Sequence, residues 1–142
     1  MDDLAKVLAA VKIDETTENG DVNIVTQESD LSEIIEHIQG FSLLALDCEG
    51  VDLGRNGRLC LVQLSTPQRS FLFDVHEVPA DAEMVNFLRE VLENEAVVKI
   101  IHDCKMDSDA LFHLLDITLT SVHDTQAWDC TIHGTEHNLN RT

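Results

Sequence analysis

Three apolar, strand-like runs follow one another closely between residues 43 and 75. They cover residues 43–49, 59–65 and 70–75, and the pair Asn56–Gly57 lies between the first two. Asn-Gly is a strong signal for a β-hairpin, and strands joined by such short turns run antiparallel. The stretch therefore predicts a three-stranded antiparallel meander, and the chain is expected to fold around a β-sheet.

The sequence on either side of the meander alternates between strand and helix patterns. Apolar spacing predicts helices over 30–38 and 81–93, from 107 or 108 to 115, and from near Thr125 onward. It predicts further strands over 22–25, 97–102 and 119–124. Three antiparallel strands followed by strand–helix–strand–helix predict an α/β domain whose mixed sheet contains parallel strands and is flanked by helices.

A chain of 142 residues suits one domain with one hydrophobic core. Residues 2–13 carry four apolar side chains at helical spacing, namely Leu4, Val7, Leu8 and Val11. The polar run over 14–21 indicates a linker. We therefore expect an N-terminal helix and linker over 1–21 and one domain over 22–142. Self-association is expected through this helix or through an exposed sheet face.

The chain is strongly acidic, with 27 Asp and Glu against 9 Lys and Arg and a formal net charge of −18. Proteins that bind nucleic acid usually show a basic surface, because neutralising phosphate drives their affinity. Three explanations stay open. Either nucleic acid is not the ligand, or divalent cations and a few arginines offset the repulsion between the acids and phosphate, or another chain or segment supplies the basic surface.

The four cysteines are Cys48, Cys60, Cys104 and Cys130, which form no Cys-x-x-Cys motif, and three of them lie in or beside apolar runs. Free thiols are typical of reducing compartments, so a cytoplasmic or nuclear protein is expected. No apolar run approaches the roughly 20 residues that a membrane-spanning helix needs. No membrane partner is therefore expected.

Two carboxylates interrupt the first strand of the meander. Asp47 and Glu49 are two residues apart, so both point to the same face of the strand, and Cys48 points to the other. Two neighbouring carboxylates repel each other unless a cation lies between them, and Mg²⁺ or Mn²⁺ prefers such oxygen ligands. The alternative is a solvated strand end with no ligand.

A second acidic site follows the strand predicted over 97–102, which ends at His102. Asp107 lies four residues before the apolar Leu111, so it is expected near the inward face of the next helix. Asp103 and Asp109 are expected to cap that helix or complement its dipole, with Asp109 pointing toward water. Asp107 is therefore the better candidate for a metal ligand.

These motifs together resemble the DEDD superfamily of 3′–5′ exonucleases. They are LALDCEG with GRLCLVQLST and FLFDV, then VVKIIHDCKMDSDAL, then VHDTQAW. The chain is most similar to the ribonuclease D-like branch, and within it to the egalitarian-like proteins, over residues 22–142. The resemblance implies a ribonuclease H-like fold.

The resemblance also implies a site and a reaction. Asp47 and Glu49 match the first family motif, and His102 with Asp107 matches the second. In the family these acids hold two divalent ions, one activating water and the other stabilising the leaving 3′ oxygen. The expected reaction releases nucleoside 5′-monophosphates from the 3′ end of single-stranded RNA or DNA. Asp124 is expected to cap a helix or support the sheet end rather than bind metal.

The third family motif, Tyr or His followed four or five residues later by Asp, is not found in this chain. The chain contains no Tyr, and none of the histidines after Asp107 has an Asp at that spacing: His113, His123, His133 and His137. The C-terminal helices expected from the resemblance are likewise missing. Two explanations stay open. Either the chain is a fragment of a longer protein, or the protein is an inactive relative of the exonucleases that serves as a binding module.

Five residues beside the two motifs are expected to contact nucleic acid: Gly50, Val51, Arg55, Arg58 and His102. For the arginines, and for Arg69, the alternative is that they only keep the turns soluble. Cys130, His133 and His137 offer three ligands of the kind that zinc prefers, but a fourth is not evident.

Three functions therefore compete. The first is a metal-dependent 3′–5′ exonuclease with Asp47, Glu49 and Asp107 as catalytic metal ligands. The second is a non-catalytic nucleic-acid-binding or adaptor domain on the same fold. The third is an acidic protein-interaction module that uses residues 2–13.

Overall fold

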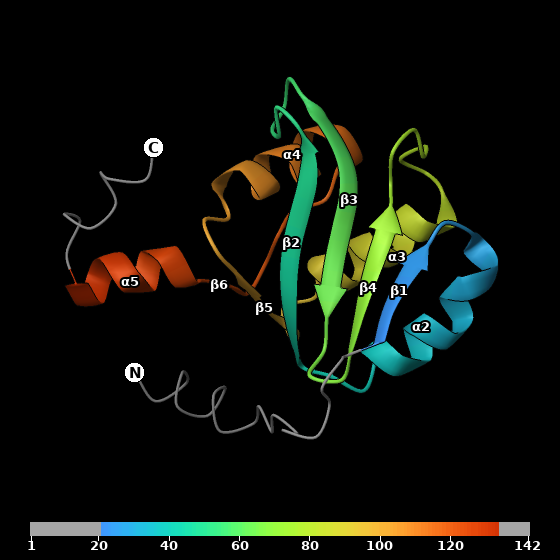
Figure 1. The fold of residues 1–142 in the computed structure, drawn as a ribbon, viewed down its shortest axis with the longest axis horizontal. Coiled ribbons are helices and arrows are strands. Elements are labelled where there is room, and N and C mark those ends of the chain that lie inside the picture. The colour runs from blue at the N-terminus through green and yellow to red at the C-terminus, as the bar shows by residue number, and fades with distance from the viewer. Residues whose placement is uncertain (1–20, 134–142) are drawn as a thin grey trace.

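The computed structural model describes residues 21–133 (Figure 1). Strands and helices alternate along this part of the chain as β1 (Asp21–Val25), the 3-10 helix η1 (Glu28–Asp30), α2 (Leu31–Ile38), β2 (Leu43–Val51), β3 (Arg58–Ser65), β4 (Arg69–Asp74), α3 (Glu83–Leu92), β5 (Val98–Ile101), α4 (Lys105–Leu115), β6 (Val122–Asp124) and α5 (Thr125–His133). The helix predicted over 2–13 lies outside the described residues. No helix among the described residues is both long and apolar enough to cross a membrane.

All six strands belong to one mixed sheet with the order β1-β4-β3-β2-β5-β6. β2, β3 and β4 are antiparallel neighbours, so the predicted meander is confirmed. β1 pairs parallel to β4, while β5 pairs parallel to β2 and β6 parallel to β5. The expected α/β fold with a mixed sheet is therefore present.

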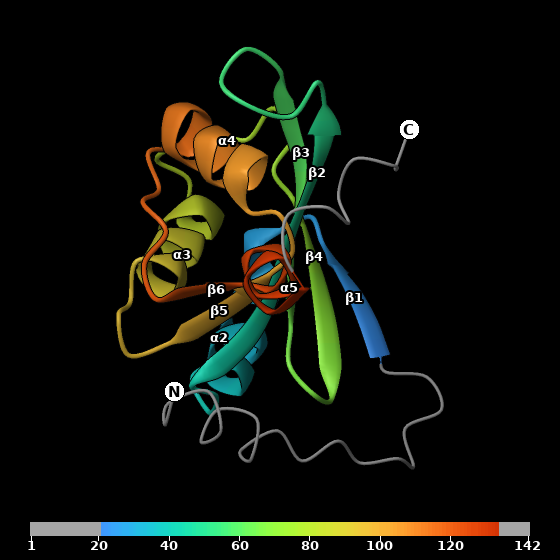
Figure 2. The same ribbon diagram turned by 90° about the vertical axis from the view of Figure 1, so that its left-hand side faces the viewer.

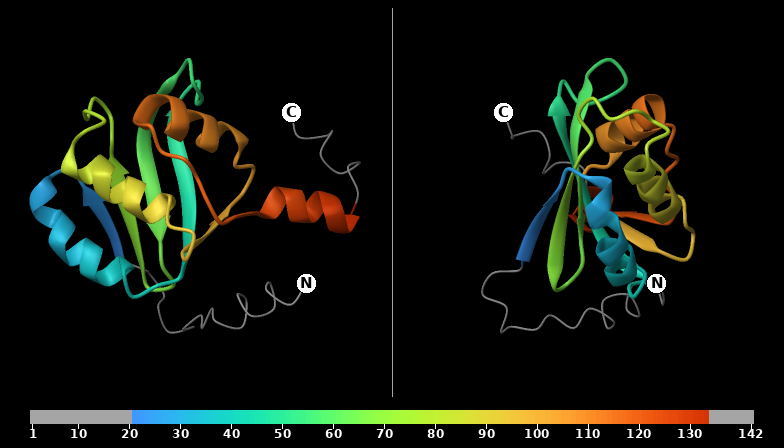
Figure 3. Two further views of the ribbon diagram at one scale, coloured as in Figure 1. Left: turned by 180° about the vertical axis from the view of Figure 1, so that it is seen from behind. Right: turned by 90° about the vertical axis from the view of Figure 1, so that its right-hand side faces the viewer.

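Helices α2, α3 and α4 lie on one face of the sheet, and α5 extends from the edge strand β6 (Figures 2 and 3). The core between sheet and helices follows from strand alternation, because every second residue of β2 and β4 faces the helices. Phe71 and Phe73 of β4 are fully buried there. On the opposite face Val22 and Ile24 of β1 are 62% and 66% exposed. No described helix covers this open face.

Strand β5 is four residues long and pairs only with Leu43–Ala45 of β2. β2 continues to Val51 with β3 as its partner, so the second half of its other edge has no neighbouring strand among residues 21–133. Helix α4 follows β5 and approaches β2 beside this unpaired edge (Figure 1). The short β5 thus leaves room for side chains of α4 at the carboxyl-terminal half of β2.

The hairpin between β2 and β3 forms, as the Asn56–Gly57 signal predicts, but these two residues are not the centre of a two-residue turn. Such a turn needs a positive φ at both central residues, whereas the positive φ angles lie at Asp52 (51°) and Gly54 (135°). The connection is a loop over residues 52–57, in which the Gly57 amide donates to the Gly54 carbonyl at 3.1 Å. A β-bulge between Glu49 and Gly50 precedes it.

The strand predicted over 119–124 is shorter than expected, because only Val122–Asp124 pair with β5. Ser121 has a φ of 49°, and the Thr120 amide donates to the Leu92 carbonyl at 3.2 Å. These residues therefore turn the chain after α4 and do not extend the sheet.

Candidate active site

Asp47 and Glu49 project from β2 onto the open face of the sheet, and both are exposed. Cys48 between them is buried on the helix-covered face. On the neighbouring strand β3, Gln63 pairs with Asp47 and Leu61 pairs with Glu49. The structure thus places both carboxylates on one face, as their two-residue spacing predicts.

Asp107 reaches the unpaired edge of β2 from the first turn of α4. Its Oδ1 accepts a hydrogen bond from the Cys48 backbone amide at 2.9 Å, and only 6% of the residue is exposed. The carboxylate therefore takes the place that a neighbouring strand would occupy beyond the end of β5. This contact brings Asp107 beside the segment that carries Asp47 and Glu49, and the predicted inward orientation of Asp107 is found.

Cys48 and Asp107 form a corner between β2 and α4, and the electrostatics of this corner disfavour a negative charge on either side chain. Burial raises the pKa of Asp107, hydrogen bonds from its own amide and from Cys48 act in the opposite direction, and the charge of Asp47 raises it further. The pKa of the Cys48 thiol is also raised, first by burial and then by the nearby Asp107. The thiol therefore stays protonated.

No Lys, Arg or His among the described residues forms an ion pair with Asp47, Glu49 or Asp107. Carboxylate oxygens without a cationic partner are the donors that Mg²⁺ and Mn²⁺ prefer, so the chemistry of the residues fits such an ion. Their geometry is not that of a finished site. Within residues 21–133 no group of three or more His, Cys, Asp or Glu side chains is arranged to hold a metal ion.

Asp124 at the end of β6 holds the loop that leads into α4. Its Oδ1 accepts from the amides of Asp103 and Gln126, both at 2.9 Å, and its Oδ2 accepts from the Cys104 amide at 3.0 Å. Burial acts to raise its pKa, but these hydrogen bonds outweigh burial and lower it to about 2. The structure therefore shows Asp124 in both roles that the sequence analysis allowed, since it caps α5 and supports the sheet end.

The expected capping role of Asp103 and Asp109 is wrong. The residue that precedes α4 is Cys104, and its side chain makes no capping hydrogen bond. Asp103 instead takes a left-handed conformation, with a φ of 57°, in the loop held by Asp124. Asp109 does not point freely to water, because only 19% of its side chain is exposed and it is bound to Arg55.

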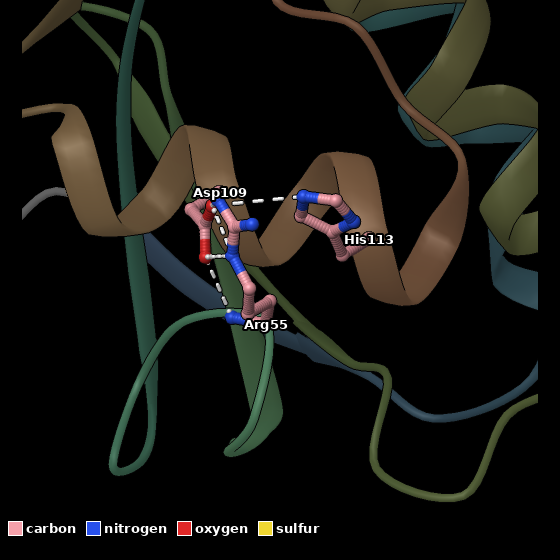
Figure 4. Close-up of polar contacts among 3 residues, drawn as sticks. All are labelled: Arg55, Asp109 and His113. Atoms are coloured by element: carbon pink, nitrogen blue, oxygen red, sulfur yellow. Dashed lines mark hydrogen bonds and ion pairs between the residues drawn. The ribbon is translucent and has the colours of Figure 1, made fainter.

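The Arg55–Asp109 contact connects the β2–β3 loop to α4 (Figure 4). The Arg55 backbone amide donates to Asp109 Oδ2 at 2.7 Å. The Arg55 Nη2 donates to Oδ1 at 2.6 Å, and its Nε lies 3.1 and 3.2 Å from the two oxygens. His113, one turn further along α4, has its Nε2 3.7 Å from Oδ1. No local pattern predicts this pair, because the two residues are 54 positions apart.

The other expected nucleic-acid contacts surround the same corner. Gly50 and Val51 follow the bulge at the end of β2, and a side chain at Gly50 would collide with the Arg58 carbonyl. Arg58 pairs with Val51 across the hairpin, and its guanidinium has no hydrogen bond or ion pair with any described residue. His102 is exposed at the end of β5, where its Nδ1 lies 2.8 Å from the Thr125 hydroxyl.

Of the zinc-type residues, Cys130 and His133 lie on α5, while His137 lies outside the described residues. His133 Nε2 lies 3.9 Å from Asp129 Oδ1. The zinc hypothesis therefore stays a prediction.

Comparison with known proteins identifies the domain. A family model described as 3′-5′ exonuclease matches residues 22–141. The chain belongs to the 3′–5′ exonuclease family. The matched range begins within β1 and includes both acidic motifs. The resemblance seen in the sequence is thereby confirmed.

Relatives of this exonuclease domain occur in larger proteins. The mouse piRNA biogenesis protein EXD1 is 40% identical over 93 residues, which are 66% of this chain and 16% of the mouse protein. Ribonuclease D of Bartonella henselae is 25% identical over 106 residues, 74% of this chain and 25% of that enzyme. The chain thus spans a quarter or less of the length of these two relatives.

Solved structures confirm the fold. RNase D of Trypanosoma brucei in complex with GMP has a TM-score of 0.71 and 29% sequence identity, covering 80% of this chain and 36% of that one. The same enzyme in complex with RNA U12 has a TM-score of 0.69, also at 29% identity, with 78% and 39% covered. The six-stranded mixed sheet with its helices is therefore the ribonuclease D-type exonuclease fold, in agreement with the ribonuclease H-like expectation.

Proposed function

We propose that this domain is a metal-dependent 3′–5′ exonuclease that removes nucleotides singly from the 3′ end of single-stranded RNA or DNA as nucleoside 5′-monophosphates. One observation supports this most strongly. Asp47, Glu49 and Asp107 all lie at the same end of β2, and no Lys, Arg or His of the described residues forms an ion pair with them. A divalent cation is the partner that such a group of carboxylates lacks.

Asp47, Glu49 and Asp107 are the proposed metal ligands, and Mg²⁺ or Mn²⁺ bound to them would generate a nucleophilic water and stabilise the leaving oxygen. Asp47 and Glu49 face outward, so a nucleic-acid end would approach from the open face of the sheet. Asp107 has its Oδ1 fixed by the Cys48 amide, which holds this carboxylate beside the segment that carries Asp47 and Glu49. The domain supplies three of the acids; the chain contains no Tyr, and no His after Asp107 is followed by Asp at the spacing of the third motif.

Gly50, Val51, His102 and Arg58 are the proposed contacts to nucleic acid. The unengaged Arg58 guanidinium is the best placed of them for a phosphate. RNA is the favoured substrate, because the RNase D of Trypanosoma brucei has been solved with RNA U12. Cys48, Cys60 and Cys104 are free thiols, which supports a cytoplasmic or nuclear location.

The test is stepwise shortening of a 5′-labelled single-stranded RNA by the complete protein. Mn²⁺ should support a ladder that shortens from the 3′ end, and EDTA should abolish it. Asp47→Asn should reduce the rate by about a hundredfold or more, because it removes a metal ligand. Asp81→Asn removes an exposed acid outside the site and serves as the control. The proposal is wrong if the protein shows no metal-dependent shortening, or if Asp47→Asn is as active as the unaltered protein.

A non-catalytic nucleic-acid-binding or adaptor function is the second candidate. The absence of a three-ligand arrangement among the described residues favours it. It predicts RNA binding that persists in Asp47→Asn and in EDTA, with no shortening under any condition. Loss of RNA binding in that variant would count against this second function.

A further inference from the structure

Helix α4 meets the β2–β3 hairpin through two carboxylates that are two residues apart. Asp107 accepts from the Cys48 amide within β2, and Asp109 accepts from the Arg55 amide in the loop that follows β2. Glu49 lies on the short segment between these two anchor points. Two contacts on one helix restrict both its shift along β2 and its rotation about its own axis, which a single contact cannot do.

The loop lies close against α4 where the second contact forms. Gly54 has a φ of 135°, and a Cβ at this residue would lie 2.6 Å from Met106 Cε and 3.4 Å from Asp109 Oδ2. Only glycine therefore fits the approach without a shift. The geometry of the loop is consistent with a role in placing Arg55 against α4.

The bonding of Arg55 argues against a phosphate contact as its main role. Its amide, Nε and Nη2 are all directed at Asp109, and such forked charged contacts hold one geometry. The Arg55 guanidinium and the Asp109 carboxylate form an ion pair at 2.6 Å. A phosphate would have to compete with this carboxylate for the guanidinium.

We propose that Arg55 and Asp109 are positioning residues, which hold α4 so that Asp107 stays in register with Asp47 and Glu49. The proposal rests on the proposed metal-dependent function, and neither residue is assigned a contact to metal or nucleic acid. It replaces the expectation that Arg55 binds phosphate.

The test uses Arg55→Lys and Asp109→Asn in the complete chain. Lysine keeps the positive charge but cannot form the fork, and asparagine keeps the size of the acid without its charge. Glu33→Gln is the control, because Glu33 on α2 pairs with Arg69 through one contact at 2.9 Å, away from the acids. Three quantities are measured for each: the Kd of Mn²⁺ by electron paramagnetic resonance, the exchange rate of the Cys48 amide by NMR, and the Kd of single-stranded RNA in Ca²⁺.

Both variants should raise the Kd of Mn²⁺ by about tenfold, as loss of groups that orient metal ligands does. Both should speed exchange of the Cys48 amide, because its acceptor Asp107 is held less firmly. The Kd of RNA should stay unchanged, and Glu33→Gln should change none of the three quantities. Recovery of a well-dispersed NMR spectrum confirms that each variant is folded.

Two results would overturn the proposal. In the first, Mn²⁺ binding and Cys48 exchange are unaltered in both variants. In the second, Arg55→Lys weakens RNA binding and Asp109→Asn strengthens it. This is the pattern expected if Arg55 binds phosphate and Asp109 competes with the phosphate for its guanidinium. If the unaltered protein binds no Mn²⁺, the proposed function fails, and Cys48 exchange alone then decides whether the pair positions α4.

Discussion

Only 6% of Asp107 is exposed, yet the carboxylate has one backbone donor from β2 and no cationic partner among the described residues. Burial and the charge of Asp47 both raise its pKa, which means that the ionised form is disfavoured in the folded protein. An ionised Asp107 therefore costs stability at neutral pH. Its Oδ1 nevertheless stabilises the fold, because it satisfies the Cys48 amide at an unpaired strand edge.

The charge of Asp107 and its hydrogen bond thus have opposite effects on stability, so two substitutions of Asp107 should differ in their free energy of unfolding. Asp107→Ala leaves the buried Cys48 amide without an acceptor and should lower the free energy of unfolding by about 1–3 kcal/mol. Asp107→Asn keeps an acceptor and removes the charge, so its free energy of unfolding should equal or exceed that of the unaltered protein. Urea denaturation at pH 7 measures both. Equal destabilisation by the two substitutions would show that the charge, and not the hydrogen bond, stabilises this corner.

At the scale of elements, the junctions after β5 and β6 form one unit around Asp124. This side chain joins the start of α5 to the loop before α4 through the amides of Gln126, Asp103 and Cys104. The same contacts affect the Cys104 thiol, whose pKa is raised to about 11 by burial and then by Asp124. The placement of α4 therefore depends on the carboxylate of Asp124, which lies at the end of β6.

Asp124 should make stability depend on pH in the acid range. Its pKa is lowered from 3.8 to about 2 in the folded protein, so its contribution is complete above the unfolded value and is lost as the pH falls toward 2. Asp124→Asn should be less stable than the unaltered protein at pH 7, and the gap should narrow between pH 4 and pH 2. Urea denaturation across this range measures the gap. A gap that stays constant with pH would show that Asp124 acts through its shape alone.

Local rules predicted the acids of this site better than the contacts between them. The two-residue repeat placed Asp47 and Glu49 on one face, and helical spacing turned Asp107 inward, because both depend only on neighbouring residues. The bond from Cys48 to Asp107 spans 59 positions and depends on how α4 docks. The Asn56–Gly57 signal found the hairpin but not its turn, because contacts with α4 shape the loop.

At the scale of the whole molecule, the net charge of −18 is spread along a chain of 142 residues. Like charges repel in the compact state, and salt screens that repulsion. Sodium chloride at physiological strength should therefore raise the Tm by about 2–4 °C over a low-salt buffer. Mn²⁺ should raise it further than sodium chloride of equal ionic strength, and Asp47→Asn should lose this excess. A Tm that falls with salt would show that attractive ion pairs dominate the surface.

The predicted self-association through an open sheet face stays a prediction. The face exists among the described residues, with Val22 and Ile24 exposed on it. The other route, through the helix predicted over 2–13, lies outside the described residues. Sedimentation velocity at several protein concentrations measures self-association directly.

The early end of β5 also has a consequence for how molecules of this protein meet one another. An unpaired strand edge is a template on which a strand of another molecule can add, and proteins commonly guard such edges with charge. Here the second half of β2 is guarded by Asp107 at the edge and by Asp47 and Glu49 on the adjoining face. The acids proposed to hold a metal ion thus also discourage intermolecular strand pairing, so replacing all three by amides should promote aggregation even where the fold survives.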